Sequence, residues 1–543
     1  MSESNPENAP LPSAALTPEE VLRCTETLQR IITDRALLAQ LPEELRRELL
    51  IAAGQVSRPE TRQKKQLVKE FRRKRSREKQ DQDRIAKNSA GIRVARQAPV
   101  FTAPAPTALP GPSSISAAPA PNTDTWPELA RPHYCYICKV EYRRVHPFYD
   151  SMCPPCAEFN YLKRHQSFDL TGMTALVTGG RVKIGYHTAL KLLRAGARVL
   201  VTTRFPRDGA ARFAKEEDYA QWRERLQLFG LDLRHSPSVE LFARYILRTE
   251  TRLDVLINNA CQTVRRPPDF YRPLIETESA PFASLPAEYR ALVAAHEDLK
   301  AALGGKETPR ELRGEASARP DLTGLSAWHG ANGANQAGAG LGLRFSAQLS
   351  TVPYAYGDEM RRPDLFPEGK TDADLQQVDL RAVNSWRLAL EDVPTPELLE
   401  VHLVNAVAPF ILNARLKGLM LRSPNPARHI VNVSAMEGIF ARGTKTDKHP
   451  HTNMAKAALN MLTYTSARGY APDGIYMNAV DTGWVTDEDP MHHAKRKIAE
   501  HDFSPPLDIV DGAARILDPV FSGFITGEHV FGKFFKDYKA ANW

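Results

Sequence analysis

A glycine-rich turn between a buried strand and a helix limits this chain to few folds. Residues 174–185 read TALVTGGRVKIG, and the helical sequence YHTALKLLRAG follows directly. The β-branched runs ARVLVTT and LDVLINNA come later and are separated by helical segments. This alternation of strand and helix is typical of a parallel sheet with crossover helices. We therefore expect an α/β fold.

The same turn indicates a bound phosphate. Backbone N–H groups and the dipole at the start of a helix bind the pyrophosphate of a dinucleotide. The candidate residues are Gly179, Gly180, Arg181, Lys183, Ile184 and Gly185. The second strand ends at Arg204, where such folds place an acid for NAD or a base for the extra phosphate of NADP, so NADP is favoured. The alternatives are a tight turn without ligand and an ordinary surface arginine.

Further motifs resemble the short-chain dehydrogenase/reductase family. The segments TGGRVKIG, INNA, VNAVAP, VNVSAMEG, AKAAL, NAVDTGWVT and FITGEHVFGK are similar to family segments and occur in the family's order. The resemblance implies a Rossmann-like doubly wound parallel sheet, a nicotinamide dinucleotide cofactor and a homo-oligomer. It also implies that Asp232 and Leu233, in LDL, lie at the adenine and that Asn259 lines the cofactor site. Lys183 replaces a family glycine, and we expect its side chain to leave the turn toward a phosphate.

Two of the four catalytic positions that the resemblance implies are altered. Asn405 and Lys456 stand at the family's asparagine and lysine. Ala435 occupies the serine position; Ser434 precedes it and would face the opposite side of a strand. Thr452 occupies the position of the tyrosine, which in the family transfers a proton to or from the substrate oxygen. An aliphatic hydroxyl is too weak an acid for that role.

Three outcomes remain open for the missing proton donor. His451 or His449 could supply the proton, because imidazole titrates near neutral pH. Glu437, or a tyrosine such as Tyr354 or Tyr356, could enter the pocket from outside the motif. The third outcome is that no hydride transfer occurs and the chain binds NADP only as a ligand.

Four of the six cysteines have the spacing of metal ligands: Cys135, Cys138, Cys153 and Cys156 form two CxxC pairs. Two such pairs bring four thiolates around one tetrahedral zinc ion, and four protein ligands leave no open position, so the site would be structural. The surrounding aromatic and basic residues could bind nucleic acid or protein. We expect them to pack on the α/β domain instead, because about 30 residues provide too small a core.

The positive charge is concentrated in one segment. Residues 57–97 hold 15 Lys and Arg against 5 Asp and Glu, a net charge of +10, whereas the whole chain carries +8. The segment has few residues to bury, so we expect a solvated basic helix that attracts nucleic acid or an acidic partner.

The chain is expected to have five parts: a short helical segment (1–56), the basic arm (57–97), a Pro- and Ala-rich linker (98–130), the zinc module (131–166) and the α/β domain (167–543). An insertion at about 265–395 interrupts the domain and includes the low-complexity stretch WHGANGANQAGAGLGL. We expect the sheet pattern to resume at ELLEVHLVNAVAPF.

Together these features indicate an NADP-binding oxidoreductase with a non-standard active site, acting on an unidentified carbonyl or alcohol. One alternative is a catalytically inactive nucleotide-binding scaffold or sensor, and another is a protein tethered to nucleic acid by its basic arm. No stretch approaches the roughly 18 apolar residues of a membrane span. The N-terminus lacks the apolar run of a signal peptide. We expect a cytoplasmic protein, or a nuclear one in a eukaryote.

Overall fold

The computed structural model describes residues 16–102, 104, 123–304, 338, 340–355 and 357–543. They belong to two compact units, Met1–Asp81 and Gln82–Trp543. The first unit holds α1 (Pro18–Thr33), α2 (Glu43–Ser57) and the beginning of α3 (Thr61–Asn88). No residue of α1 or α2 is buried, so these helices lack a core of their own.

The last part of the basic segment belongs to the second unit. There, α4 (Gly91–Gln97) holds Arg93, which is only 9% exposed. Its guanidinium donates hydrogen bonds to Asp150 at 2.5 Å and to Asp502 at 2.8 Å. The expectation of a solvated helix therefore does not hold for α4, because acids elsewhere in the unit bind its cation.

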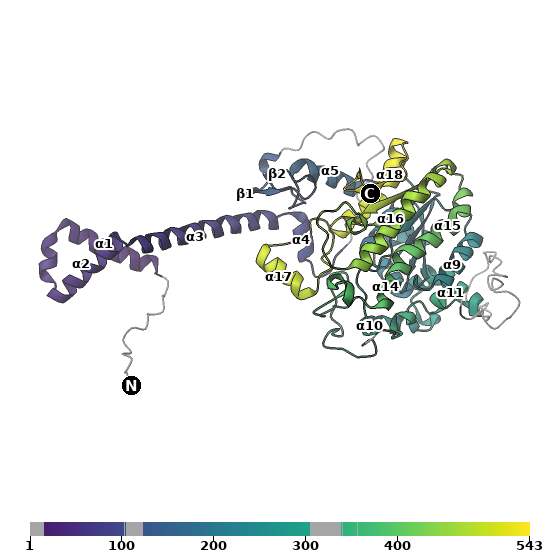
Figure 1. The fold of residues 1–543 in the computed structure, drawn as a ribbon, viewed down its shortest axis with the longest axis horizontal. Helices are drawn as coiled ribbons and strands as arrows, with labels where there is room; N and C mark the ends of the chain where they lie inside the picture. Colours follow the sequence, from purple (N-terminus) through teal and green to yellow (C-terminus); the bar gives the residue numbers. More distant parts are fainter. Residues whose placement is uncertain (1–15, 103, 105–122, 305–337, 339, 356) are drawn as a thin grey trace. The chain divides into compact units, whose positions relative to one another are not determined.

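An eight-stranded sheet forms the centre of the second unit (Figure 1). Its order is β10-β9-β8-β7-β6-β3-β4-β5, and all neighbours are parallel except β9 and β10. The strands are β3 (Thr174–Thr178), β4 (Arg198–Thr203), β5 (Leu226–Gly230), β6 (Val255–Asn258), β7 (Arg428–Ser434), β8 (Ile475–Asp481), β9 (Phe534–Lys536) and β10 (Lys539–Ala541). Because connections run outward from β3 in both directions, this is the Rossmann-like doubly wound sheet that was expected.

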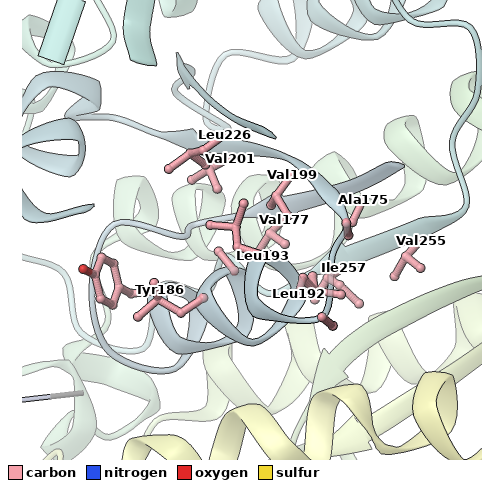
Figure 2. Close-up of a cluster of buried hydrophobic side chains, with 14 of the residues drawn as sticks. Ala175, Val177, Tyr186, Leu192, Leu193, Val199, Val201, Leu226, Val255 and Ile257 are labelled. Carbon is pink, nitrogen blue, oxygen red and sulfur yellow. The ribbon is translucent and has the colours of Figure 1, made fainter. Parts of the chain in front are cut away.

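Helices cover both faces of the sheet. Ala175, Val177 and Val199 pack toward α6 (Lys183–Arg194) and α18 (Ile509–Thr526), and Figure 2 shows part of this cluster. The alternate residues Leu176 and Leu200 belong to the cluster that holds α9 (Ser236–Thr249) and α15 (Ala408–Leu421). α16 (Pro450–Tyr470) packs on β7 and β8. Burial on both faces explains why the central strands are rich in apolar residues.

The cysteine-containing module packs on the α/β domain. It consists of β1 (Glu128–Tyr134), β2 (Glu141–Arg144) and α5 (Pro154–His165), so its first strand starts inside the range expected for the linker. In α5, buried Arg164 donates hydrogen bonds to Asp508 at 2.6 Å and to Asp511 at 2.9 Å, and Asp511 lies in α18. A buried and hydrogen-bonded ion network of this kind fixes the docking geometry of the module.

The insertion lies beside the β5 edge of the sheet. α11 (Ala287–Gly304) and α13 (Leu341–Arg344) pack on β5, and α10 (Pro268–Ser279) packs on α7 (Pro206–Phe213). Most of the low-complexity stretch lies outside the described residues.

The segment ELLEVHLVNAVAPF is helical, and the expectation of a strand there is wrong. It forms α14 (Thr395–His402), a π-helical turn (Leu403–Val407) and the start of α15. The buried residues Val401, Ala408 and Leu412 recur at a helical period rather than in strict alternation. The helical run Thr395–Leu421 is long and apolar enough to cross a membrane, but half of its most apolar window is buried in this domain.

Candidate active site

One cavity of about 1260 Å³ lies at the carboxyl ends of the parallel strands. Its lining comes from the glycine-rich turn, the ends of β4, β6, β7 and β8, the start of α16, and the insertion. Doubly wound sheets bind their ligands at this edge. The volume exceeds the roughly 300–1,000 Å³ of common ligand pockets, which leaves space for a dinucleotide and a second molecule.

The glycine-rich turn is held close to β6. Gly179 has a φ of +69°, and a Cβ there would lie 2.8 Å from the Cα of Ala260. A Cβ on Gly185 would lie 2.2 Å from the side-chain nitrogen of Asn259. Asn259 Nδ2 donates to the carbonyl of Thr178 at 3.0 Å and to that of Gly179 at 3.2 Å. These contacts require glycine at both positions and leave the start of α6 beside the cavity.

The two cations of the turn have acidic partners. Arg181 Nη1 donates to Asp208 at 2.6 Å. Lys183 has a φ of +54°, a value that favours glycine, and its side chain leaves the turn. Its Nζ lies 3.9 Å from Asp374 Oδ2 in the insertion. Ile184 lines the cavity and contacts α18 at Gly512. The backbone N–H groups of the turn are thus the groups best placed for a phosphate.

Arg204 differs from these cations because its partners are neutral. Its guanidinium donates to Tyr271 Oη at 2.8 Å and to Ser350 Oγ at 3.1 Å. Within the part of the chain that the structure describes, no carboxylate pairs with it. Its charge therefore remains available to an anion in the cavity.

Asp232 and Leu233 line the same end of the cavity. Asp232 is buried and accepts hydrogen bonds from Arg234, the shortest at 2.6 Å. Burial acts to raise the pKa of Asp232, but the charge of Arg234 outweighs it and the pKa is lowered. The carboxylate is therefore ionised at neutral pH and already has a cationic partner.

The expected asparagine, threonine and lysine come from two helices. Lys456 and Thr452 lie one turn apart in α16, and both line the cavity. Lys456 Nζ donates to the carbonyl of Val433 at 2.7 Å. Asn405 lies in the π-helical turn, accepts the N–H of Gln262 at 2.8 Å and donates to its carbonyl at 3.2 Å. Such π-turns are frequent at functional sites.

Of the two histidines at the start of α16, only His449 lines the cavity. His451 does not line the cavity; its Nε2 lies 3.3 Å from Glu397 Oε1. His449 does line the cavity, and its ring stacks on Trp386 with 3.9 Å between centroids. Burial lowers the pKa of His449 below its ordinary value, so the ring is neutral at pH 7.

The other proposed proton donors are paired, lie outside the cavity lining or lie outside the described residues. Glu437 lines the cavity but forms an ion pair with Arg442 at 2.7 Å. Tyr354 lies outside the lining, with its hydroxyl 3.4 Å from Arg265 Nε. Tyr356 lies outside the described residues.

Sequence reasoning missed two cavity residues. Asp481 ends β8 and is buried, and burial raises its pKa to about 6. Tyr136 comes from the cysteine-containing module, and its hydroxyl accepts the N–H of Trp484 at 3.0 Å. An acid at the carboxyl end of a parallel strand could have indicated Asp481, whereas no local pattern indicated Tyr136.

The four cysteines have the geometry of a metal site. The Sγ atoms of Cys135, Cys138, Cys153 and Cys156 all lie within 4.8 Å of one another. Four thiolates at zinc–sulfur distances near 2.3 Å would be about 3.8 Å apart, so small movements suffice to bind zinc. The donor set fits the metal that the spacing predicted.

The chain is similar to several known proteins. Residues 173–273 match the model of the short chain dehydrogenase family. The chain is 29% identical over 403 residues to uncharacterized protein R665 of Acanthamoeba polyphaga mimivirus, covering 71% of each. It is 39% identical over 108 residues to dehydrogenase/reductase SDR family member 13 of Homo sapiens, covering 20% of this chain and 26% of that protein. The Pseudomonas aeruginosa RhlG/NADP complex has a TM-score of 0.39 at 17% identity and covers 68% of this chain and 96% of that one.

The matched segment is therefore similar to short-chain dehydrogenases. It contains the glycine-rich turn, Arg204, Asp232 and Asn259. The chain spans about a quarter of the human dehydrogenase/reductase that it matches.

Proposed function

We propose that this protein binds NADP(H) and catalyses the reduction of a carbonyl or the oxidation of an alcohol. The supporting observation is a single cavity in which the glycine-rich turn, Arg204 and Lys456 meet. A turn for the pyrophosphate, a cation for the extra phosphate and a lysine at the far end suit one dinucleotide in an extended position. Arg204 favours NADP over NAD because no acid occupies that position to bind ribose hydroxyls.

Each residue has a defined task in this proposal. Bound NADPH supplies the hydride. The N–H groups at the start of α6 bind the pyrophosphate, and the Arg204 guanidinium binds the extra phosphate. The Lys456 ammonium holds the nicotinamide ribose and favours negative charge on the reacting oxygen. Asn405 fixes the segment at Gln262, which borders the same cavity.

A catalytically inactive nucleotide-binding scaffold is the second candidate. The observation that favours it is the replacement of both the serine and the tyrosine that the family uses for catalysis. Ala435 has no hydroxyl group, and the Thr452 hydroxyl is buried without a hydrogen-bond partner among the described residues.

Titration with NADPH, followed by turnover measurements on the full chain, tests both candidates. The first predicts NADPH binding and its consumption with at least one member of a broad panel of aldehydes and ketones. The second predicts binding without consumption. No binding at millimolar NADPH would exclude both. Parallel titration with NADH tests the cofactor preference.

We further propose that the four cysteines bind one structural zinc ion. The proposal rests on their spacing and on the proximity of their Sγ atoms. Four sulfur ligands would fill the tetrahedral coordination of zinc, which makes the site structural rather than catalytic. Metal analysis of purified protein should find one zinc per chain, and a preparation that contains no metal would contradict the proposal.

We also propose that the protein forms a homo-oligomer through α14, α15 and α16. Exposed apolar side chains gather on these helices, namely Leu399, Phe410, Met454, Met461 and Tyr464. α14 packs directly on α16. Exposed apolar patches of this kind often mark protein–protein contacts.

A further inference from the structure

We propose that Asp481 replaces the missing tyrosine as the residue that exchanges a proton with the substrate oxygen. This inference rests on the proposed oxidoreductase function and identifies the group that would complete its site.

Asp481 ends a strand, β8, that packs on the helix carrying Lys456. β7 and β8 end together, with Ser434 paired in register with Asp481. Side chains alternate along β8, so Asp481 shares a face with Met477. Met477 belongs to the cluster that includes Ala467 of α16. Asp481, Thr452 and Lys456 all line the cavity, so the acid and the lysine face one space.

The carboxyl group of Asp481 has one cation, Lys536, at the limit of ion-pair distance. One oxygen accepts the N–H of Met436 at 3.3 Å, and the other lies 4.0 Å from Lys536 Nζ. The charged and titratable groups around it are Lys536 and Asp537 near the C-terminus, Glu437 after β7, Arg515 of α18 and Tyr136 of the cysteine-containing module. Burial prevails over the two cations and raises the pKa of Asp481 to about 6. An acid near this value can both hold and release a proton close to neutral pH.

The competing groups are less suited to the role. Glu437 is paired with Arg442 at 2.7 Å, and such a pair stabilises the carboxylate. His451 lies against Glu397 outside the cavity lining. His449 is covered on one face by Trp386. The Thr452 hydroxyl is too weak an acid.

In the direction of reduction, the carbonyl carbon accepts a hydride from bound NADPH, and the carbonyl π electrons move to the oxygen. That oxygen accepts the proton of the Asp481 carboxyl group. The products are the alcohol, NADP⁺ and the Asp481 carboxylate, and a proton taken up from bulk solvent then restores the carboxyl group. Lys456 takes no part in the proton transfer.

The variant Asp481→Asn tests the assignment in the full chain. We expect its NADPH affinity to stay within about threefold of wild type, and its turnover to fall by about 10² or more, the usual contribution of a general acid. The wild-type rate of reduction should decline above about pH 6 as the acid ionises, and this limb should vanish in the variant. Asp473→Asn is the matched control, because Asp473 pairs with Lys417 at 2.7 Å and lies outside the cavity lining.

A readout that does not depend on turnover is the ¹³C spectrum of protein labelled at aspartate carboxyl carbons. We expect one signal that titrates near pH 6 and is missing from Asp481→Asn, but present in Asp473→Asn. A signal that titrates near pH 4 would overturn the assignment, as would a variant with wild-type turnover and pH profile. Failure of wild type to bind NADPH, or to consume it, would instead overturn the oxidoreductase proposal and this inference with it.

Discussion

The guanidinium of Arg204 lies over the ring of Tyr271, 4.6 Å from its centroid, and also donates to the Tyr271 hydroxyl at 2.8 Å. Arg204 follows β4, and Tyr271 belongs to α10 of the insertion. The insertion therefore supports the cation that the sequence assigns to the NADP phosphate. A stacked and hydrogen-bonded arginine is held in one orientation before any ligand arrives, which reduces the entropy cost of binding.

Replacement of Arg204 should weaken NADPH binding more than NADH binding. A charge-assisted contact of about 1.5–3 kcal/mol corresponds to a loss of roughly 10- to 150-fold in affinity. Arg204→Ala should show this loss for NADPH in fluorescence titrations, while NADH affinity changes little. Arg223→Ala is the control, because Arg223 is exposed and, among the described residues, forms an ion pair with exposed Glu224 alone. Equal losses for both cofactors would contradict the assignment.

The stability of the protein should depend on pH through Asp481. Its folded pKa of about 6 lies above the ordinary value of 3.8, so the folded state binds the proton more tightly than the unfolded state. Its contribution to stability is therefore most favourable below about pH 4 and declines until about pH 6. The total change is about 3 kcal/mol. Asp481→Asn should gain stability relative to wild type across this window. Urea unfolding at several pH values measures the difference, and a difference that does not change with pH would refute the prediction.

Removal of the metal should disturb the cavity as well as the module. Tyr136 lies between the proposed ligands Cys135 and Cys138 and contacts Trp484 across the cavity wall. Cys138→Ser should lower zinc content, the unfolding temperature and NADPH affinity together. Cys24→Ser, an exposed cysteine outside the cluster, should alter none of them. Full zinc content in Cys138→Ser would show that Cys138 is not a zinc ligand and would contradict the proposed four-cysteine site.

Charge placed on the exposed apolar helices should dissociate the proposed oligomer. Phe410 is 56% exposed in α15, so Phe410→Asp costs little in the isolated chain but is unfavourable in an apolar interface. Light scattering after size exclusion should show a lower mass for this variant than for wild type. A monomeric wild-type protein would contradict the proposal.

The sequence predicts those parts of the fold that depend on residues close together along the chain. The strand, turn and helix from Thr174 to Arg194 follow from β-branched residues, glycines and a helical apolar period within about 20 residues. The parallel sheet follows from the same repeated unit, whereas its doubly wound arrangement was implied by the family resemblance. The segment from Glu397 to Phe410 was read wrongly because Leu399, Val401 and Leu403 alternate, although tertiary packing selects the helical stripe instead.

The candidate site was less predictable because distant residues assemble it. Arg204 and Lys456 could be located by motif, but their partners in the insertion and in β7 could not. Tyr136 is 348 residues from the Trp484 backbone that it contacts. The direction of His451 away from the cavity depends on the register of α16, which a short motif does not fix.

The position of Tyr136 also bears on how this protein can be shortened. A chain that began at Phe168 would retain the whole sheet and every dehydrogenase-like segment, yet it would lose Tyr136 and Lys139 from the cavity lining. It would also expose buried Asp508 and Asp511 without Arg164, and leaving such carboxylates unpaired is strongly destabilising. The smallest fragment that keeps both the nucleotide cavity and its ion network therefore includes the cysteine-containing module.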